Sequence, residues 1–129
     1  MKPDEYKLEL RVYLEDTDAQ GIVYHGNYFR FFERGRSEIL DAMGVSVAES
    51  TRPDCRLVVH EMRIRFRRPA FLGEKIEVIT TIKRSSEYRL VFHQEIRRKN
   101  EAEILVSAET DIVAINDAGT LKELPAIFD

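Results

Sequence analysis

Apolar and polar residues alternate along residues 6–14, the first patterned segment of the chain. The apolar positions are Leu8, Leu10, Val12 and Leu14. Charged residues stand between them, and a period of two is typical of a strand with one buried face. We expect this strand to end at residues 15–16, where turn-favouring aspartate begins a different pattern.

The period changes after residue 27, where apolar residues recur at helical spacing. They are Tyr28, Phe29, Phe31, Phe32, Ile39, Leu40 and Met43. This pattern predicts one long helix over about residues 27–43, with Asn27 as its N-cap and Gly44 at its C-cap. Gly35 in the middle weakens a helix by about 1 kcal/mol relative to alanine. We therefore expect the helix backbone to approach a sheet closely at Gly35.

Strand patterns dominate the rest of the chain. After a loop over residues 45–54, alternation predicts strands over residues 56–68, 74–84, 88–98 and 103–116, with a short piece at 121–124. One face of the first is expected to carry Val58, His60, Met62, Ile64 and Phe66. Consecutive strands joined by short turns pair antiparallel. The expected class is α+β, an antiparallel sheet of about five strands against one long helix.

Composition narrows the possible functions. The 129 residues fit one domain over residues 1–129. A formal net charge of -3 gives no basic excess for nucleic acid, and we expect no nucleic-acid partner. The single cysteine, Cys55, forms no intramolecular disulfide, and the histidines lack metal-ligand spacing, so we expect no metal. No apolar run is long enough to insert in a membrane, and the N-terminal segment lacks a signal-peptide pattern, so we expect a cytoplasmic protein.

The candidate chemistry lies between the first strand and the helix. The segment from Tyr13 to Tyr28 reads YLEDTDAQGIVYHGNY. Asp18 lies in its turn, where an aspartate is more often a cap or an Asx-turn residue but can also act as a general base or nucleophile. Backbone N–H groups near a helix start can hold a developing oxyanion. Asp16 has the same chemistry, and we interpret it as structural.

This segment, followed by Glu33-Arg34-Gly35-Arg36, resembles the 4-hydroxybenzoyl-CoA thioesterase-like family, nearest its Tol-Pal-associated acyl-CoA thioesterase branch. The resemblance implies a hotdog fold and hydrolysis of a short-chain, medium-chain or aromatic acyl-CoA, with no cofactor. Gln20 and Gly26 depart from the usual pattern. Residues 85–87 also lack the basic run that holds CoA phosphates in the 4-hydroxybenzoyl-CoA enzymes.

The resemblance also implies a set of site residues. The catalytic ones are Asp18 as general base or nucleophile, the backbone N–H of Tyr24, and His25. Those expected to contact substrate are Gly21, Val23, Tyr28 and Glu33, together with Val59 and His60 on a neighbouring subunit's strand 56–62. Arg67, Arg68 and Arg89 are the candidates for binding CoA. For the side chain of His25 the alternative is structural packing, and we interpret the side chains of His60 and His93 as structural.

Several alternatives stay open at this stage. Two basic groups, Arg63 to Arg68 and Arg97 to Lys99, could hold the CoA nucleotide or dock an acyl carrier protein, or could be a solvated strand face. The chain could therefore hydrolyse acyl-carrier-protein thioesters, or could be a non-catalytic acyl-CoA-binding or scaffold protein. A hotdog dehydratase is a weaker alternative. The poorly covered sheet predicts a homodimer, and a dimer of dimers (a homotetramer) is expected.

Overall fold

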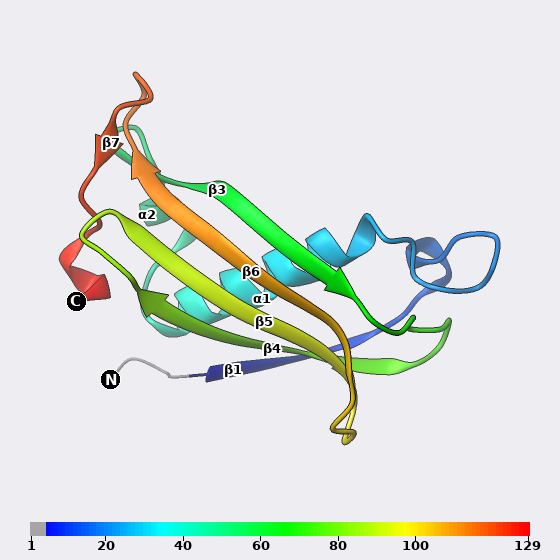
Figure 1. The fold of residues 1–129 in the computed structure, drawn as a ribbon. Helices are drawn as coiled ribbons and strands as arrows, with labels where there is room; N and C mark the ends of the chain where they lie inside the picture. Colours follow the sequence, from blue (N-terminus) through cyan, green and yellow to red (C-terminus); the bar gives the residue numbers. More distant parts are fainter. Residues whose placement is uncertain (1–4) are drawn as a thin grey trace.

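A long antiparallel sheet curls around one helix in the computed structural model, which describes residues 5–129 without the side chain of Val47 (Figure 1). Met1–Asp4, which begin the segment expected to lack a signal peptide, lie outside the described residues. The elements are β1 (Glu5–Arg11), η1 (Leu14–Asp16), α1 (Asn27–Ala42), α2 (Val47–Ser50), β2 (Thr51–Arg52), β3 (Cys55–Phe66), β4 (Lys75–Arg84), β5 (Arg89–Arg98), β6 (Ile104–Ile115), β7 (Leu121–Lys122) and η2 (Ala126–Phe128).

The sheet order is β1-β4-β5-β6-β3-β2, every pairing is antiparallel, and β7 pairs with β6. Five strands are long, and β2 and β7 have two residues each. The predicted α+β class, with about five strands around a long helix, is confirmed. No helix among residues 5–129 is long and apolar enough to cross a bilayer.

The middle of α1 lies very close to the sheet, as the glycine at position 35 predicted. A Cβ added to Gly35 would stand 2.7 Å from Thr80 Oγ1 and 2.8 Å from Gln94 Nε2. The buried Gln94 amide donates to the Phe32 carbonyl at 2.8 Å and to Thr80 Oγ1 at 2.9 Å. Arg36 Nη1 donates to Gln94 Oε1 at 3.2 Å. This contact ties the helix backbone to β4 and β5.

Two apolar clusters fill the space between α1 and the sheet. The one near the helix start is built around Phe31 and Phe32, and the one near the helix end around Ile39 and Phe92. The alternation predicted for β4 and β5 is confirmed, because Ile76, Val78, Leu90 and Ile96 are all almost fully buried. The polar contact at Gln94 separates the two clusters along the helix.

Two helix-end predictions fared differently. Gly44 N–H donates to the Asp41 carbonyl and Val45 N–H to the Leu40 carbonyl, a Schellman motif that ends α1 where predicted. Asn27 is the first helical residue, not the N-cap, and Gly26 precedes it without a side-chain cap. The Asn27 side chain instead donates to the Asp16 carbonyl at 2.9 Å, which binds the helix start to the preceding loop.

Three predictions about local structure were wrong. β1 ends at Arg11, and Leu14 is 74% exposed in a 3-10 turn instead of facing the core. The expected loop over residues 45–54 contains α2, which Ser46 caps by accepting from the Glu49 N–H. The register of β3 on β6 shifts between Val59 and Glu61, so the predicted single face of alternate residues changes side at His60.

Candidate active site

The segment between β1 and α1 is an ordered loop with its own hydrogen bonds. Asp18 N–H donates to the Ile22 carbonyl at 3.0 Å, and Tyr24 N–H donates to the Asp16 carbonyl at 2.9 Å. The Asp16 carboxylate accepts from Tyr13 N–H at 2.8 Å. The structural role expected for Asp16 is therefore confirmed, because both its carbonyl and its side chain hold the loop.

The Asp18 carboxylate is exposed, and only one of its two oxygens accepts a hydrogen bond. Its Oδ1 accepts from Gln20 N–H at 2.8 Å, the Asx-turn arrangement that such a position favours. Its Oδ2 has no hydrogen-bond or ion-pair partner among residues 5–129. The turn bond fixes the orientation of the carboxylate, and the second oxygen is left available for chemistry.

The amide expected to stabilise an oxyanion is already used. Tyr24 N–H is bound to the Asp16 carbonyl, so Tyr24 cannot offer it to a substrate in this conformation. Within the described part of the chain, the next two N–H groups, those of His25 and Gly26, have no acceptor. Gly26 lies beneath the Tyr24 ring, where an added Cβ would stand 2.7 Å from Cε2. The N–H groups of His25 and Gly26 are thus both available as donors near the helix start.

A pocket of about 300 Å³ lies beside this helix start. Its lining comes from the loop, α1 and the end of β3: Ile22, Val23, His25, Tyr28, Phe66, Arg67, Arg68 and Pro69. The Phe66 ring centroid lies 5.7 Å from that of Tyr28 and 6.5 Å from that of His25. Five residues predicted for the site thus meet at one pocket. Sequence reasoning missed Phe66 and Pro69, because only the fold brings them to the motif, and it did not single out Ile22 within the motif.

Tyr28 forms the buried side of this pocket. Its hydroxyl accepts from Ala70 N–H at 3.2 Å, and burial raises the pKa of Tyr28 above its ordinary 10.0. The Ala70 carbonyl in turn accepts from Val23 N–H at 2.9 Å. The helix start, the loop and residues 69–73 are thereby bound to one another around the pocket.

Other predicted residues lie away from the pocket within one chain. Asp18 does not line it, although its N–H binds the carbonyl of the lining residue Ile22. Glu33 is exposed farther along α1, and Val59 and His60 are exposed at the irregular point of β3. Arg89 begins β5, at the other end of the sheet from Phe66, and lies 3.6 Å from Asp111. Within one chain these residues do not line the pocket.

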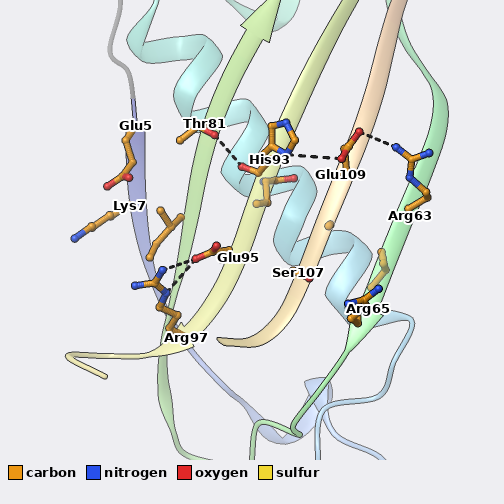
Figure 2. Close-up of a pocket in the computed structure, with 14 residues that line it drawn as sticks. Glu5, Lys7, Arg63, Arg65, Thr81, His93, Glu95, Arg97, Ser107 and Glu109 are labelled. Atoms are coloured by element: carbon orange, nitrogen blue, oxygen red, sulfur yellow. Dashed lines mark hydrogen bonds and ion pairs between the residues drawn. The ribbon is translucent and has the colours of Figure 1, made fainter. Parts of the chain in front are cut away.

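A larger hollow of about 710 Å³ lies on the face of the sheet that points away from α1 (Figure 2). None of the predicted catalytic or substrate-contacting residues lines it, although Arg63, Arg65 and Arg97 of the two basic groups do. Part of its charge is paired, since Glu109 contacts both Arg63 and His93, and Glu95 contacts Arg97. Its composition resembles a solvated strand face, so we place the site at the smaller pocket.

The arginines expected to form a basic surface are largely paired with carboxylates. Arg63 contacts Glu109 at 2.7 Å, and Arg98 is bound to Glu74. Arg68 lies 3.7 Å from Glu103, a longer contact. Arg67 has no ion-pair partner among residues 5–129 and lines the pocket. The paired arginines favour a solvated strand face over a docking surface for an acidic protein.

The residue pattern, the fold and the pocket can now be compared with known proteins. A sequence profile described as the thioesterase-like superfamily matches residues 12–128. The chain belongs to the thioesterase-like superfamily. The hotdog fold implied by the resemblance is confirmed by solved thioesterases that share the curled sheet and single long helix.

Relatives of this chain include named thioesterases. The acyl-CoA thioester hydrolase YbgC of Escherichia coli is 38% identical over 106 residues, covering 78% of this chain and 79% of the relative. The acyl-CoA thioesterase YbgC of Haemophilus influenzae is 31% identical and covers 95% and 88%. A 1,4-dihydroxy-2-naphthoyl-CoA thioesterase from Synechocystis superposes with a TM-score of 0.89 at 27% identity, over 95% and 91% of the two chains.

Proposed function

We propose that the protein is an acyl-CoA thioesterase that hydrolyses a short-chain, medium-chain or aromatic acyl-CoA to the free acid and CoA. The observation that carries the proposal is the free Oδ2 of Asp18, held by an Asx turn in a loop that ends at the helix start and pocket. The relatives named as acyl-CoA thioester hydrolases support the same activity. We place this activity in the cytoplasm, where acyl-CoA is made and used.

Asp18 supplies the attack on the thioester carbonyl carbon. As a general base its Oδ2 takes a proton from water, which adds to the carbonyl, and the proton then passes to the departing CoA sulfur. As a nucleophile Oδ2 adds to the carbonyl carbon and the C–S bond breaks, releasing CoA as the thiolate, which takes up a proton. Water then cleaves the mixed anhydride into the free acid and the Asp18 carboxylate. Both routes give one carboxylic acid and one thiol from one thioester and one water.

The helix start supplies the electrostatic stabilisation. The His25 N–H has no acceptor among the described residues and lies at the positive end of α1, so it suits the developing oxyanion. The His25 side chain lines the pocket beside Phe66 and contacts the leaving thiol or the water. We propose His25 N–H in place of Tyr24 N–H because the latter is bound to Asp16.

The pocket accepts the thioester end of the substrate. Val23, Tyr28 and Phe66 give it an apolar and aromatic wall, which suits an apolar acyl group. Arg67 and Arg68 lie at the same pocket and can bind CoA phosphates through their forked N–H groups. Gly21 shapes the loop, since its carbonyl accepts from Leu72 N–H at 3.0 Å.

A homodimer completes the site in this proposal. The edge of β3 beyond β2 has no strand partner in the described part of the chain, and Val59 and Phe66 on it are each 51% exposed. Tyr24 and Phe29 are also about half exposed near the helix start. A second β3 would cover this apolar surface and bring its Val59 and His60 to the pocket. We propose a dimer of dimers as the full assembly.

The test is thiol release across a panel of acyl-CoA esters, from acetyl to palmitoyl and including benzoyl. We expect wild-type turnover with at least one ester, and a fall of about 10³-fold or more in kcat for Asp18→Asn. Asp16→Asn is the matched control, because it keeps an acceptor for Tyr13 N–H and should lose only a few-fold.

Three other results would change the assignment. Turnover that survives in Asp18→Asn would place the chemistry at another residue. Turnover of acyl-carrier-protein esters alone would favour that substrate class, which the paired arginines disfavour. Saturable binding of acyl-CoA with no turnover would make the protein a binding module.

A further inference from the structure

One surface turn, residues 69–73 between β3 and β4, is hydrogen-bonded to the loop that joins β1 to α1. We name it the support turn. Val23 N–H donates to the Ala70 carbonyl at 2.9 Å, and Leu72 N–H donates to the Gly21 carbonyl at 3.0 Å. Ile22 and Phe71 also form an isolated antiparallel bridge. The stretch of loop between Asp18 and His25 therefore rests on this turn.

The support turn is held by polar contacts more than by burial. Phe71 and Leu72 are 47% and 49% exposed, and within the turn only Ala70 is fully buried among the apolar side chains described. Each backbone N–H from residue 70 to 73 has its own acceptor: Tyr28 Oη, Glu74 Oε1, the Gly21 carbonyl and the Val12 carbonyl. The position of the turn thus depends on where these acceptors are fixed.

A single ion pair, between Glu74 and Arg98, provides one of these acceptors and also contacts the first residue of the turn. Glu74 Oε1 accepts from Phe71 N–H at 2.6 Å, while its Oε2 accepts from Arg98 Nε. Arg98 Nη2 donates to the Pro69 carbonyl at 3.1 Å. The pair therefore contacts the start of the support turn at Pro69 and its middle at Phe71, and the fork of one guanidinium joins a carboxylate to a backbone carbonyl.

Burial and a second carboxylate restrict the movement of the Glu74–Arg98 ion pair. The side chains of Arg98 and Glu74 are only 21% and 26% exposed, and a second carboxylate, Glu103, lies 3.7 Å from Arg98 Nη1. The hydrogen bond to Glu74 raises the pKa of Arg98 above its ordinary range. Arg98 therefore stays charged, and nothing in this environment suggests that it is available to bind CoA.

From this geometry we infer that Glu74 and Arg98 are positioning residues for the thioesterase reaction. They set the support turn, which sets the loop that presents Asp18 and the His25 N–H to the pocket. The inference rests on the proposed function, since it assigns the pair a role in that reaction. It adds two residues that do not line the pocket and to which the sequence assigned no catalytic role.

The test compares Arg98→Met and Glu74→Gln with a matched pair one residue away. Arg97 and Glu95 form an ion pair of similar exposure on the same strand but contact no residue of the support turn. We expect Arg98→Met and Glu74→Gln each to lower kcat about tenfold with KM within about twofold, because a small misplacement of the attacking group weakens the transition state more than substrate binding. Arg97→Met and Glu95→Gln should leave both within about twofold.

Amide hydrogen exchange measures whether the loop stays hydrogen-bonded to the support turn, and it does not depend on turnover. Exchange of Val23 N–H and Leu72 N–H should speed up in Arg98→Met and Glu74→Gln but not in the control pair. The double variant should lose no more kcat than either single one, because the two residues act as a unit. Arg98→Lys should recover part of kcat, since lysine can meet Glu74 without reaching Pro69 as well.

The outcomes separate this inference from the proposed function. Faster exchange together with a tenfold loss of kcat supports it. A loss of kcat with unchanged exchange overturns it, and so does faster exchange with unchanged kcat. If wild-type protein turns over no thioester, the proposed function fails, and the role of the pair in that reaction falls with it, although the exchange data still show whether the pair holds the loop.

Discussion

The two ends of α1 differ in capping and in the burial of the apolar side chains around them. At its C-terminal end the Schellman motif satisfies the last carbonyls, and Leu124 and Phe128 cover the apolar cluster with 5% and 4% exposure. At its N-terminal end no side chain caps the helix, and Phe29 and Phe66 stay about half exposed. The completed end stabilises the chain, and the incomplete end is where a substrate and a second subunit can bind.

The largest expected effects come from one phenylalanine at each end. Phe128→Ala should lower the free energy of unfolding by about 3 kcal/mol and leave kcat nearly unchanged, because Phe128 is buried far from the pocket. Phe66→Ala should lower it by about 1 kcal/mol or less but reduce kcat/KM about tenfold, because Phe66 lines the pocket. Urea unfolding and thiol release measure both. Equal effects of the two substitutions on stability would remove the distinction between the ends.

A substitution in the middle of the helix should affect both ends. Gly35→Ala would place a Cβ within 2.8 Å of three side chains on β4 and β5, so we expect a loss of about 1–3 kcal/mol despite the higher helix propensity of alanine. Ser37→Ala, at an exposed position of the same helix, is the control and should change stability by about 0.5 kcal/mol or less. Thermal unfolding with Gly35→Ala as stable as wild type would show that the sheet can move away from the helix.

The raised pKa of Tyr28, near the N-terminal end of α1, makes the free energy of unfolding depend on pH. Burial raises this pKa above 10.0, so the folded state holds the phenol proton more tightly than the unfolded state. The stability that this proton contributes is complete below pH 10 and is lost as the pH rises through the folded pKa. The stability advantage of wild type over Tyr28→Phe should therefore shrink between about pH 8 and about pH 11.

Urea unfolding at the two pH values measures this difference. Tyr13→Phe is the control, because Tyr13 is 60% exposed. An advantage of wild type over Tyr28→Phe that stays constant or grows with pH would contradict the assignment.

The smallest effect is expected at the residue that precedes the helix. Gly26 has a φ of -65°, which proline also adopts, and the exposed Tyr24 ring is free to move aside. If His25 N–H holds the oxyanion, Gly26→Pro should stay within about threefold of Gly26→Ala in kcat, because the amide it removes is not used. A loss of about 10²-fold in proline alone, with the fold intact, would transfer that role to Gly26 N–H.

Much of the fold could be predicted because its elements carry a clear period. β4 and β5 alternate without interruption, and the apolar stripe of α1 is long. The close approach at Gly35 was predictable from the weakness of glycine in a helix. The bend in β3 was not, since Leu57, Val58 and Val59 are all apolar and fit either face; only pairing with β6 decides between them.

The structure brings some of the predicted site residues together at one pocket, but the sequence could not predict their hydrogen bonds. The motif led to Asp18, His25 and Tyr28, and the structure brings the last two to one pocket. It could not show that the Tyr24 amide is bound to Asp16, because a backbone bond across a loop leaves no pattern in side chains. Nor could it show the role inferred for Glu74 and Arg98, which meet only when β4 and β5 pair.

The irregular register at His60 has a consequence for which chains can join this sheet. From Leu57 to Phe66 the outer edge of β3 is unpaired in the described structure, and such an edge invites association with any extended strand. A β-bulge interrupts that edge, so a regular strand cannot pair along its whole length. A second copy carries the same interruption at the same position, and two-fold symmetry can bring the two into register. In the proposed dimer, this extra residue would favour a second copy of the chain over a regular strand at that edge.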